Sequence, residues 1–150
     1  MPLPEDVRVS WALHNGGLTD AAWVLTYGEL MPLGRIVKQW KMYCQWQKDE
    51  GFGLGENFAP RDIAGPIKPV YWSPKRLAVT DNSGDSLTLD LDPPAEGVLG
   101  QVLDFDHELG PTVVVAKSWS SFLAKWADDL EAGKYVYFPD GGMVAPPGTY

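Results

Sequence analysis

Two aspartates at strand spacing, Asp90 and Asp92, come nearest to a reactive pair in this 150-residue chain. Residues two apart on a strand point to the same side, and two carboxylates there can hold a divalent cation or act as acid and base. The run 87–92 alternates leucine with threonine or aspartate, which predicts one apolar and one acidic strand face. Because no nearby His, Lys or Arg completes a site, we interpret the acidic face as solvated. A metal-dependent hydrolase using both aspartates is the least favoured of three hypotheses.

The other chemically capable residues form no catalytic or metal-binding pattern. Residues 81–85 resemble the start of a calcium loop, but Ser86 and Asp92 stand where an EF-hand requires glycine and glutamate. His14 and His107 are the only two histidines, and neither has a second His or Cys at zinc-ligand spacing. The sequence therefore indicates a protein that is not an enzyme and has no cofactor or metal.

Cys44 is the single cysteine, and it lies on the apolar face of a predicted helix, which is typical of a buried small hydrophobe. A lone thiol forms no internal disulfide. The first residues show no basic region followed by an apolar stretch, and no apolar run approaches the roughly 20 residues that cross a bilayer. These features predict a cytoplasmic protein with no membrane partner.

Hydrophobic periodicity predicts the elements that position these residues. A helical period is found at 4–14, 35–48 and 118–130, and a period of two, or a short apolar run, at 77–80, 87–91, 100–105 and 112–116. We expect a turn at 81–85, an ordered glycine- and proline-rich loop at 51–69, and a short strand at 135–138. Helices around a run of antiparallel strands predict an α+β fold, a meander sheet flanked by helices. One domain is expected at 1–138, with a loose tail at 139–150.

The helical faces predict which side chains enter the core. Val7, Trp11 and His14 share a face of the first helix, and Trp40 and Trp126 lie on the apolar faces of the other two. The apolar face of the second helix is predicted to hold Ile36, Val37, Trp40, Tyr43, Cys44 and Gln47, and that of the third Phe122, Leu123, Trp126 and Leu130. Trp46 falls at the edge of its stripe, so partial exposure is expected.

Charge is distributed unevenly along the chain. Residues 1–76 hold nine bases and eight acids, net +1, whereas residues 77–150 hold three bases and twelve acids, net −9. The total of −8 argues against a nucleic-acid partner. The acidic excess either aids solubility or forms a docking face for a cationic protein. The candidate partner-binding residues are Asp81, Asp85, Asp90, Asp92, Asp104, Asp106, Trp46 and Trp72.

Several short motifs, in order, resemble those of the SUKH superfamily, specifically its Smi/Knr-type branch. They are Leu3-Pro4-Glu5-Asp6-Val7-Arg8 with Leu13-His14-Asn15-Gly16-Gly17, the helix at 35–48, Trp72-Ser73-Pro74, Thr80-Asp81 with Gly84-Asp85, Leu89-Asp90-Leu91-Asp92-Pro93 followed by Gly97 and Gly100-Gln101-Val102, and Ser118-Trp119-Ser120-Ser121-Phe122-Leu123. The segment from Leu89 to Val102 is the most specific match. Arg76-Leu77-Ala78 departs from the family's Trp-Ile-Pro. A helix commonly precedes the Leu-Pro motif in the family, and we expect either that it is missing here or that the chain is a shortened form.

The resemblance implies a sheet flanked by helices, a binding role and no catalytic residues to carry over. It also implies that some motif residues maintain the fold: Trp72, Pro74, Asp92, Pro93, Gly100, Gln101, Ser118, Phe122 and Leu123. Bacterial members are mostly immunity proteins that neutralise a cognate toxin, often a nuclease, and fungal members are scaffolds or regulators of cell-wall assembly. We expect first an immunity protein that neutralises a cognate bacterial toxin by direct binding, such as a basic nuclease domain. The alternative is a scaffold or regulator of the cell-wall type.

Overall fold

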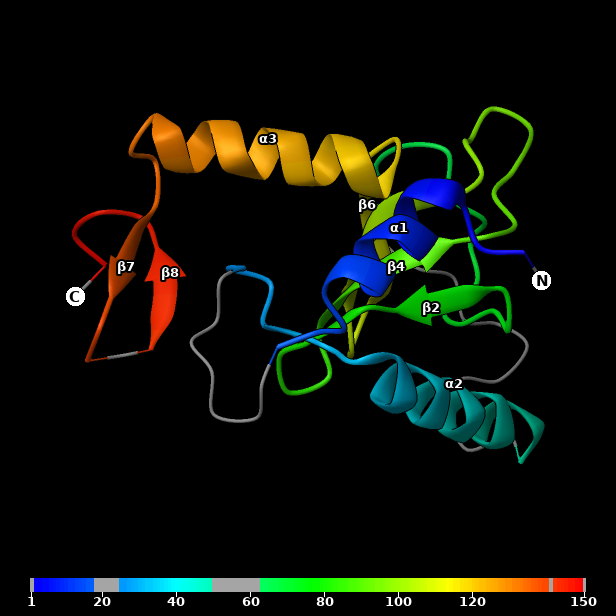
Figure 1. Cartoon of the computed structure of the whole chain (residues 1–150). Coiled ribbons are helices and arrows are strands. Elements are labelled where there is room, and N and C mark those ends of the chain that lie inside the picture. Colours follow the sequence, from blue (N-terminus) through cyan, green and yellow to red (C-terminus); the bar gives the residue numbers. More distant parts are fainter. Residues whose placement is uncertain (1, 18–24, 50–62, 141, 150) are drawn as a thin grey trace.

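The computed structural model describes residues 2–17, 25–49, 63–140 and 142–149, so most of the predicted loop at 51–69 lies outside the described residues. In that part of the chain the elements run α1 (Glu5–Leu13), β1 (Glu29–Leu30), α2 (Leu33–Lys48), β2 (Arg76–Ala78), β3 (Thr80–Asp81), β4 (Ser86–Asp90), β5 (Gln101–Asp106), β6 (Gly110–Ala116), α3 (Trp119–Glu131), β7 (Val136–Phe138) and β8 (Met143–Ala145) (Figure 1). The predicted α+β class is confirmed.

The central sheet is the antiparallel meander expected from the strand pattern, with the order β2-β4-β5-β6. Before β4 the chain turns at Asn82–Asp85, where the two end residues exchange backbone hydrogen bonds of 2.8 and 3.1 Å. Ser83 and Gly84 occupy the centre of this turn with φ of 56° and 107°. Positive φ at both central residues matches the twist of a hairpin, and this conformation explains the glycine.

The main core lies on the face of the meander that α1 and α3 cover. Trp11 of α1 lies 5.2 Å from Trp119 of α3, measured between ring centroids, and Trp119 stacks on Phe122 at 5.3 Å. Val7, Trp11 and Trp126 are buried there with the sheet leucines, as the helical faces predicted. Ser118 caps α3, since its side chain accepts from the Ser121 backbone N–H at 3.1 Å.

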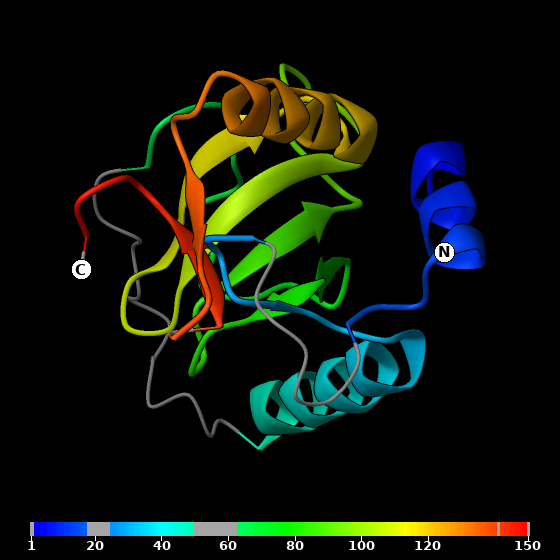
Figure 2. The same ribbon diagram turned by 60° about the vertical axis from the view of Figure 1, so that its left-hand side comes forward.

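A second, aromatic core lies where α2 meets the sheet. Tyr43 of α2 is buried with Trp72 and with Phe105 of β5. Figure 2 shows the meander between α3 and α2, with α1 beside it. The sheet is therefore covered from both directions, so a polar residue on either of its faces can be buried.

The acidic solvent face predicted for the strand at 87–91 is wrong. All five residues of β4 are buried, including Thr88 and Asp90. Residues 66–70, well before β4 in the sequence, lie over this side and accept hydrogen bonds from the strands. Alternation along one strand cannot reveal a cover supplied from elsewhere in the chain.

Three residues of the predicted helices that were expected to be buried are exposed. His14 is exposed because α1 ends at Leu13 and the chain is extended at His14. Val37 is 47% exposed and Gln47 is exposed, because α2 buries only the stripe that contains Ile36 and Tyr43. Trp40 is partly buried and donates its indole N–H to the Pro74 carbonyl at 2.8 Å.

The C-terminal residues predicted as a loose tail form part of the structure. Strand β8 pairs with β7, with Tyr137 opposite Val144. Val144 is buried in the main core, and this burial offsets the entropy cost of ordering the segment. Among the described residues, no helix is both long and apolar enough to cross a bilayer.

Candidate functional site

The six aspartates predicted to bind a partner fall into three groups. Asp85, Asp104 and Asp106 lie close together at one end of the meander. Asp81 and Asp92 are neutralised by bases, and Asp90 is buried. The register explains the first group, because Leu87 faces Asp104 across β4 and β5, and the turns that carry Asp85 and Asp106 lie at the same end.

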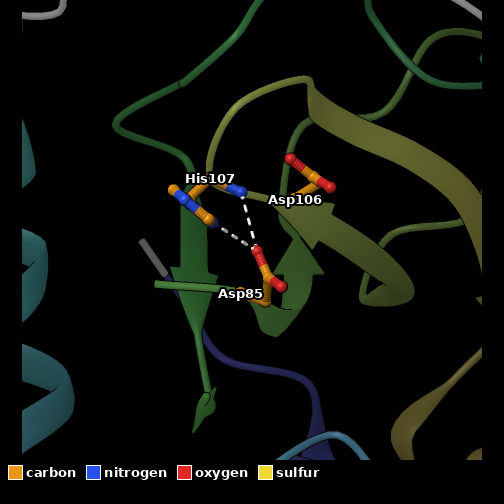
Figure 3. Close-up of side chains that lie close together, drawn as sticks. All are labelled: Asp85, Asp106 and His107. Carbon is orange, nitrogen blue, oxygen red and sulfur yellow. Dashed lines mark hydrogen bonds and ion pairs between the residues drawn. The ribbon is translucent and has the colours of Figure 1, made fainter. Parts of the chain in front are cut away.

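Asp85 and His107 form a pair between these two turns (Figure 3). The ring Nδ1 of His107 lies 2.8 Å from Asp85 Oδ1, and the His107 backbone N–H donates to the same oxygen at 3.0 Å. The side-chain hydrogen bond raises the pKa of His107 and lowers the pKa of Asp85. The Tyr71 hydroxyl fixes the histidine further by donating to its carbonyl at 2.6 Å.

Asp104 and Asp106 complete this surface. Asp106 Oδ1 accepts the backbone N–H groups of Glu108 and Leu109 at 2.7 and 2.9 Å, which holds the β5–β6 turn. Asp104 is half-buried, and burial raises its pKa, with the charges of Asp85 and Asp106 adding to the effect. We call Asp85, Asp104, Asp106 and the exposed Glu108 the acidic end.

A metal ion is a second way to interpret part of the acidic end. One ligand atom each from Asp85, Asp106 and His107 lies within 4.8 Å of the others. However, the Asp85–His107 contact already joins two of these groups, and Asp106 Oδ1 holds two backbone N–H groups. These hydrogen bonds account for the arrangement, so we treat it as a charged surface. Sequence reasoning missed His107, although the hairpin register places its turn beside Asp85.

Asp81 and Asp92 are less available to a partner than the sequence suggested. Arg35 forms an ion pair with Asp81 and another, at 2.6 Å, with Glu29. Asp92 pairs with Lys68 at 2.8 Å and Lys75 at 3.5 Å. The hydrogen bond from Lys68 is the main reason that the pKa of Asp92 is lowered. Bases from before residue 77 therefore neutralise part of the acidic second half.

Asp90 belongs to a buried polar row across three strands. Arg76 and Gln101 stand opposite it on β2 and β5, and all three residues are about 1% exposed. Gln101 donates to Asp90 Oδ2 at 3.2 Å and to the Pro66 carbonyl at 2.8 Å. The Asp90 carboxylate is thus part of the fold, and the pair proposed for a hydrolase is not a solvent-accessible site.

Arg76 extends this row to the covering segment. Its two Nη atoms donate to the carbonyls of Val70 and Lys68 at 2.8 and 2.9 Å. Burial lowers the pKa of Arg76, and the Asp90 charge opposes that shift. In the sequence Arg76 stands out only as a departure from a family motif, and this role cannot be seen there because its main-chain partners carry no sequence signal.

Trp72 and Trp46 have different environments. Trp72 is 4% exposed and stacks on Tyr43 with ring centroids 4.5 Å apart, so it is a core residue and is corrected as a partner-binding candidate. Trp46 is 44% exposed and meets Tyr43 edge-on at 5.6 Å. One side of the Trp46 ring is therefore anchored while part of it faces solvent.

The other motif residues serve backbone or core positions. Gly100 has φ of 84°, and a Cβ there would lie 2.5 Å from Pro4 Cγ. At Gly97 a Cβ would lie 2.6 Å from Pro93 Cβ. Phe122 is buried, and Leu123 is partly buried against the main core. These positions hold α1, the 93–100 segment and α3 on the sheet.

Comparisons with known proteins give a consistent result. The family model described as SMI1 / KNR4 family (SUKH-1) matches residues 1–125. The "Cell wall assembly regulator SMI1" of Saccharomyces cerevisiae is 35% identical over 75 residues, covering 49% of this chain and 15% of the relative. A "KNR4/SMI1 homolog" of Kluyveromyces lactis is 40% identical over 79 residues, covering 50% and 14%. The "Cell wall biosynthesis/cell cycle regulator smi1" of Schizosaccharomyces pombe is 28% identical over 153 residues, covering 95% and 30%. The chain spans less than a third of the length of these relatives.

Proposed function

This chain belongs to the SMI1/KNR4 (SUKH-1) family, and from that premise we propose that it is a non-catalytic, protein-binding regulatory domain of the cell-wall assembly type. The observation that carries the proposal is the naming of its relatives as regulators of cell-wall assembly, cell-wall biosynthesis and glucan synthesis. Since the matched part is a fraction of each relative, the regulatory role of the whole relatives is extended to this chain as part of the proposal. We place its action in the cytoplasm, in keeping with a single cysteine.

The proposed binding surface is the acidic end. Its carboxylates lie on the last residues of β5 and on the two turns beside them, which the meander and the Asp85–His107 pair hold in place. A fixed group of like charges raises the association rate of a cationic partner more than it raises final affinity. We infer that the partner presents a basic patch to this end of the sheet.

Toxin neutralisation, the first expectation from the sequence, is the second candidate function. The acidic end supports it, because a basic nuclease would be attracted to the same carboxylates. The names of the relatives favour the regulatory role instead. The two roles share a surface, so the experiment must test cell-wall function itself.

A chimera tests the regulatory proposal. The matching segment of the Saccharomyces cerevisiae regulator is replaced by this chain, and growth is measured in a strain lacking the regulator, in the presence of a cell-wall-perturbing dye. We expect the chimera to restore growth and the doubly neutralised variant Asp85→Asn with Glu108→Gln to restore it less. Glu96→Gln with Asp128→Asn, which neutralises two exposed acids outside the acidic end, is the matched control and should behave as the unmodified chimera. A stably expressed chimera that restores no growth would contradict the proposal.

A further inference from the structure

The outer face of α2 differs in charge from the rest of the molecule. Lys38, Lys41 and Lys48 are all exposed along it, beside Met42 and Trp46, which are 40% and 44% exposed. We call these five residues the lysine face. With 3.6 residues per turn, Lys38, Lys41 and Lys48 fall on the side of α2 away from the buried stripe, while Met42 and Trp46 follow Lys38 at intervals of four residues along one flank of that side. Helix α2, which packs on the sheet, therefore presents three cations and two apolar side chains to solvent.

These lysines lack the counter-charges that most other bases have. Arg8, Arg35, Lys68, Lys75, Lys125 and Lys134 each form an ion pair with an acid. Within the part of the chain that the structure describes, no acid lies within ion-pair distance of Lys38, Lys41 or Lys48. The nearest acid in the helix sequence, Asp49, accepts both hydrogen bonds of the Gln45 amide, at 3.0 and 2.9 Å. A chain of net charge −8 thus carries a local positive surface.

We propose that the lysine face docks an acidic segment of a protein partner, with an aromatic or aliphatic side chain of that segment over Met42 and Trp46. This proposal rests on the binding role proposed above but assigns a different surface and the opposite charge to the partner. Lys38, Met42 and Trp46 form one row at intervals of four residues, and Lys38 and Trp46 are eight residues apart, about 12 Å along a helix axis. An extended segment of about five residues covers that length. The partner chemistry is therefore a short acidic run interrupted by an apolar residue.

Charge complementarity favours a short protein segment over other anions. A nucleic acid or an anionic membrane is long compared with the Debye length of about 8 Å and would also meet the field of the whole chain, which is −8. A short segment is attracted by the local cations alone. Trp46, supported edge-on by Tyr43, offers a pre-positioned ring surface at low entropy cost, as hot-spot tryptophans do.

The test uses a defined probe. A fluorescent nine-residue peptide of aspartates and glutamates with a central phenylalanine is titrated with the full chain at low salt. We expect saturable binding, with amide shifts in the NMR spectrum confined to α2 and its neighbours. Lys41→Glu should weaken binding about fivefold or more, because one attraction becomes a repulsion. Lys117→Glu makes the same change in net charge at an exposed lysine outside α2 and should change binding less than twofold.

A second pair of measurements tests the apolar part. Replacing the central phenylalanine of the peptide by serine should weaken binding to the unmodified chain but not to Trp46→Ala. Equal losses in Lys41→Glu and Lys117→Glu, or no shifts on α2, would overturn the proposal. So would tighter binding of a single-stranded oligonucleotide or of phosphatidylserine vesicles than of the peptide. Because the chimera experiment alters only the acidic end, the two proposals can fail separately.

Discussion

Gln101 joins Asp90 of the central strand to the Pro66 carbonyl of the segment that covers it, through a single amide nitrogen. The Gln101 side-chain oxygen also accepts the Val98 backbone N–H at 3.1 Å. One buried side chain therefore connects the covering segment, strand β4 and the turn just before β5. Asp90 completes the arrangement by accepting the Asp92 backbone N–H at 3.2 Å.

Removing the Asp90 carboxylate is expected to destabilise the fold. Asp90→Ala removes one hydrogen-bond acceptor of the Gln101 amide nitrogen. It also removes the negative charge that favours the charged form of buried Arg76. We expect a loss of about 3 kcal/mol in the free energy of unfolding. Urea unfolding measures it, with Glu96→Ala as a control that removes one exposed acid and should cost less than about 0.5 kcal/mol. Equal stability of the two variants would show that Asp90 is solvated after all.

The same residues show what the sequence can predict. The meander follows from local signals, namely the period of two and the turn at 81–85, and both depend on residues that are neighbours in the chain. The burial of Asp90 depends on the main-chain carbonyls of residues 66–70, which have no side-chain pattern. The alternating pattern therefore predicts that Asp90 is exposed to solvent, although the structure buries it.

The candidate site was predictable to a similar extent. Asp85, Asp104 and Asp106 meet because the register of β4 against β5, two strands that follow each other in the meander, brings the Asn82–Asp85 turn beside the end of β5 that carries Asp104 and Asp106. The loss of Asp81 and Asp92 from the site could not be foreseen, because Arg35, Lys68 and Lys75 reach them from earlier in the chain. Val144 was missed for a related reason, since a three-residue strand gains its stability from the distant core it enters.

The Asp85–His107 pair predicts a pH dependence with two limits. The pKa of His107 is raised, so its stabilising contribution is complete below the unfolded pKa of histidine and is lost as pH rises through the folded value. The pKa of Asp85 is lowered, so its contribution is present above the unfolded aspartate pKa and is lost as pH falls through the folded value. The pair is therefore strongest in weakly acidic solution, where both groups are charged.

NMR titration of the His107 ring checks this dependence. Asp85→Asn should lower the pKa of His107, because the hydrogen bond to the carboxylate is the main cause of the raised value. Asp128→Asn, an exposed acid on α3 that does not contribute to the shift, should leave the titration unchanged. An unaltered His107 pKa in Asp85→Asn would contradict the pair.

Two tryptophans that contact the same tyrosine should differ in their cost of removal. Trp72→Ala removes a buried ring that stacks on Tyr43 and meets Phe105 edge-on, so a loss of about 3–5 kcal/mol is expected from lost burial and the cavity. Trp46→Ala removes a ring that is 44% exposed, and a loss below about 2 kcal/mol is expected. Urea unfolding followed by circular dichroism compares them. Near-equal costs would mean that Trp46 is a core residue and does not offer an open surface.

The half-buried Asp104 should reduce stability at neutral pH. Its pKa is raised, first by burial and then by Asp85 and Asp106, so the folded state holds its proton more tightly than the unfolded state does. The stability cost is absent below the unfolded pKa and develops as pH rises through the folded value.

Asp104→Asn should therefore raise the melting temperature at pH 7, and this gain should disappear near pH 3. Glu108→Gln, exposed at the same end, is the control and should give little change at either pH. A gain for Asp104→Asn at pH 7 would mean that the chain carries an acid at a position where an amide is more stable, as expected of a residue retained for binding. No gain, or an equal gain at both pH values, would contradict the raised pKa and leave Asp104 as an ordinary surface acid.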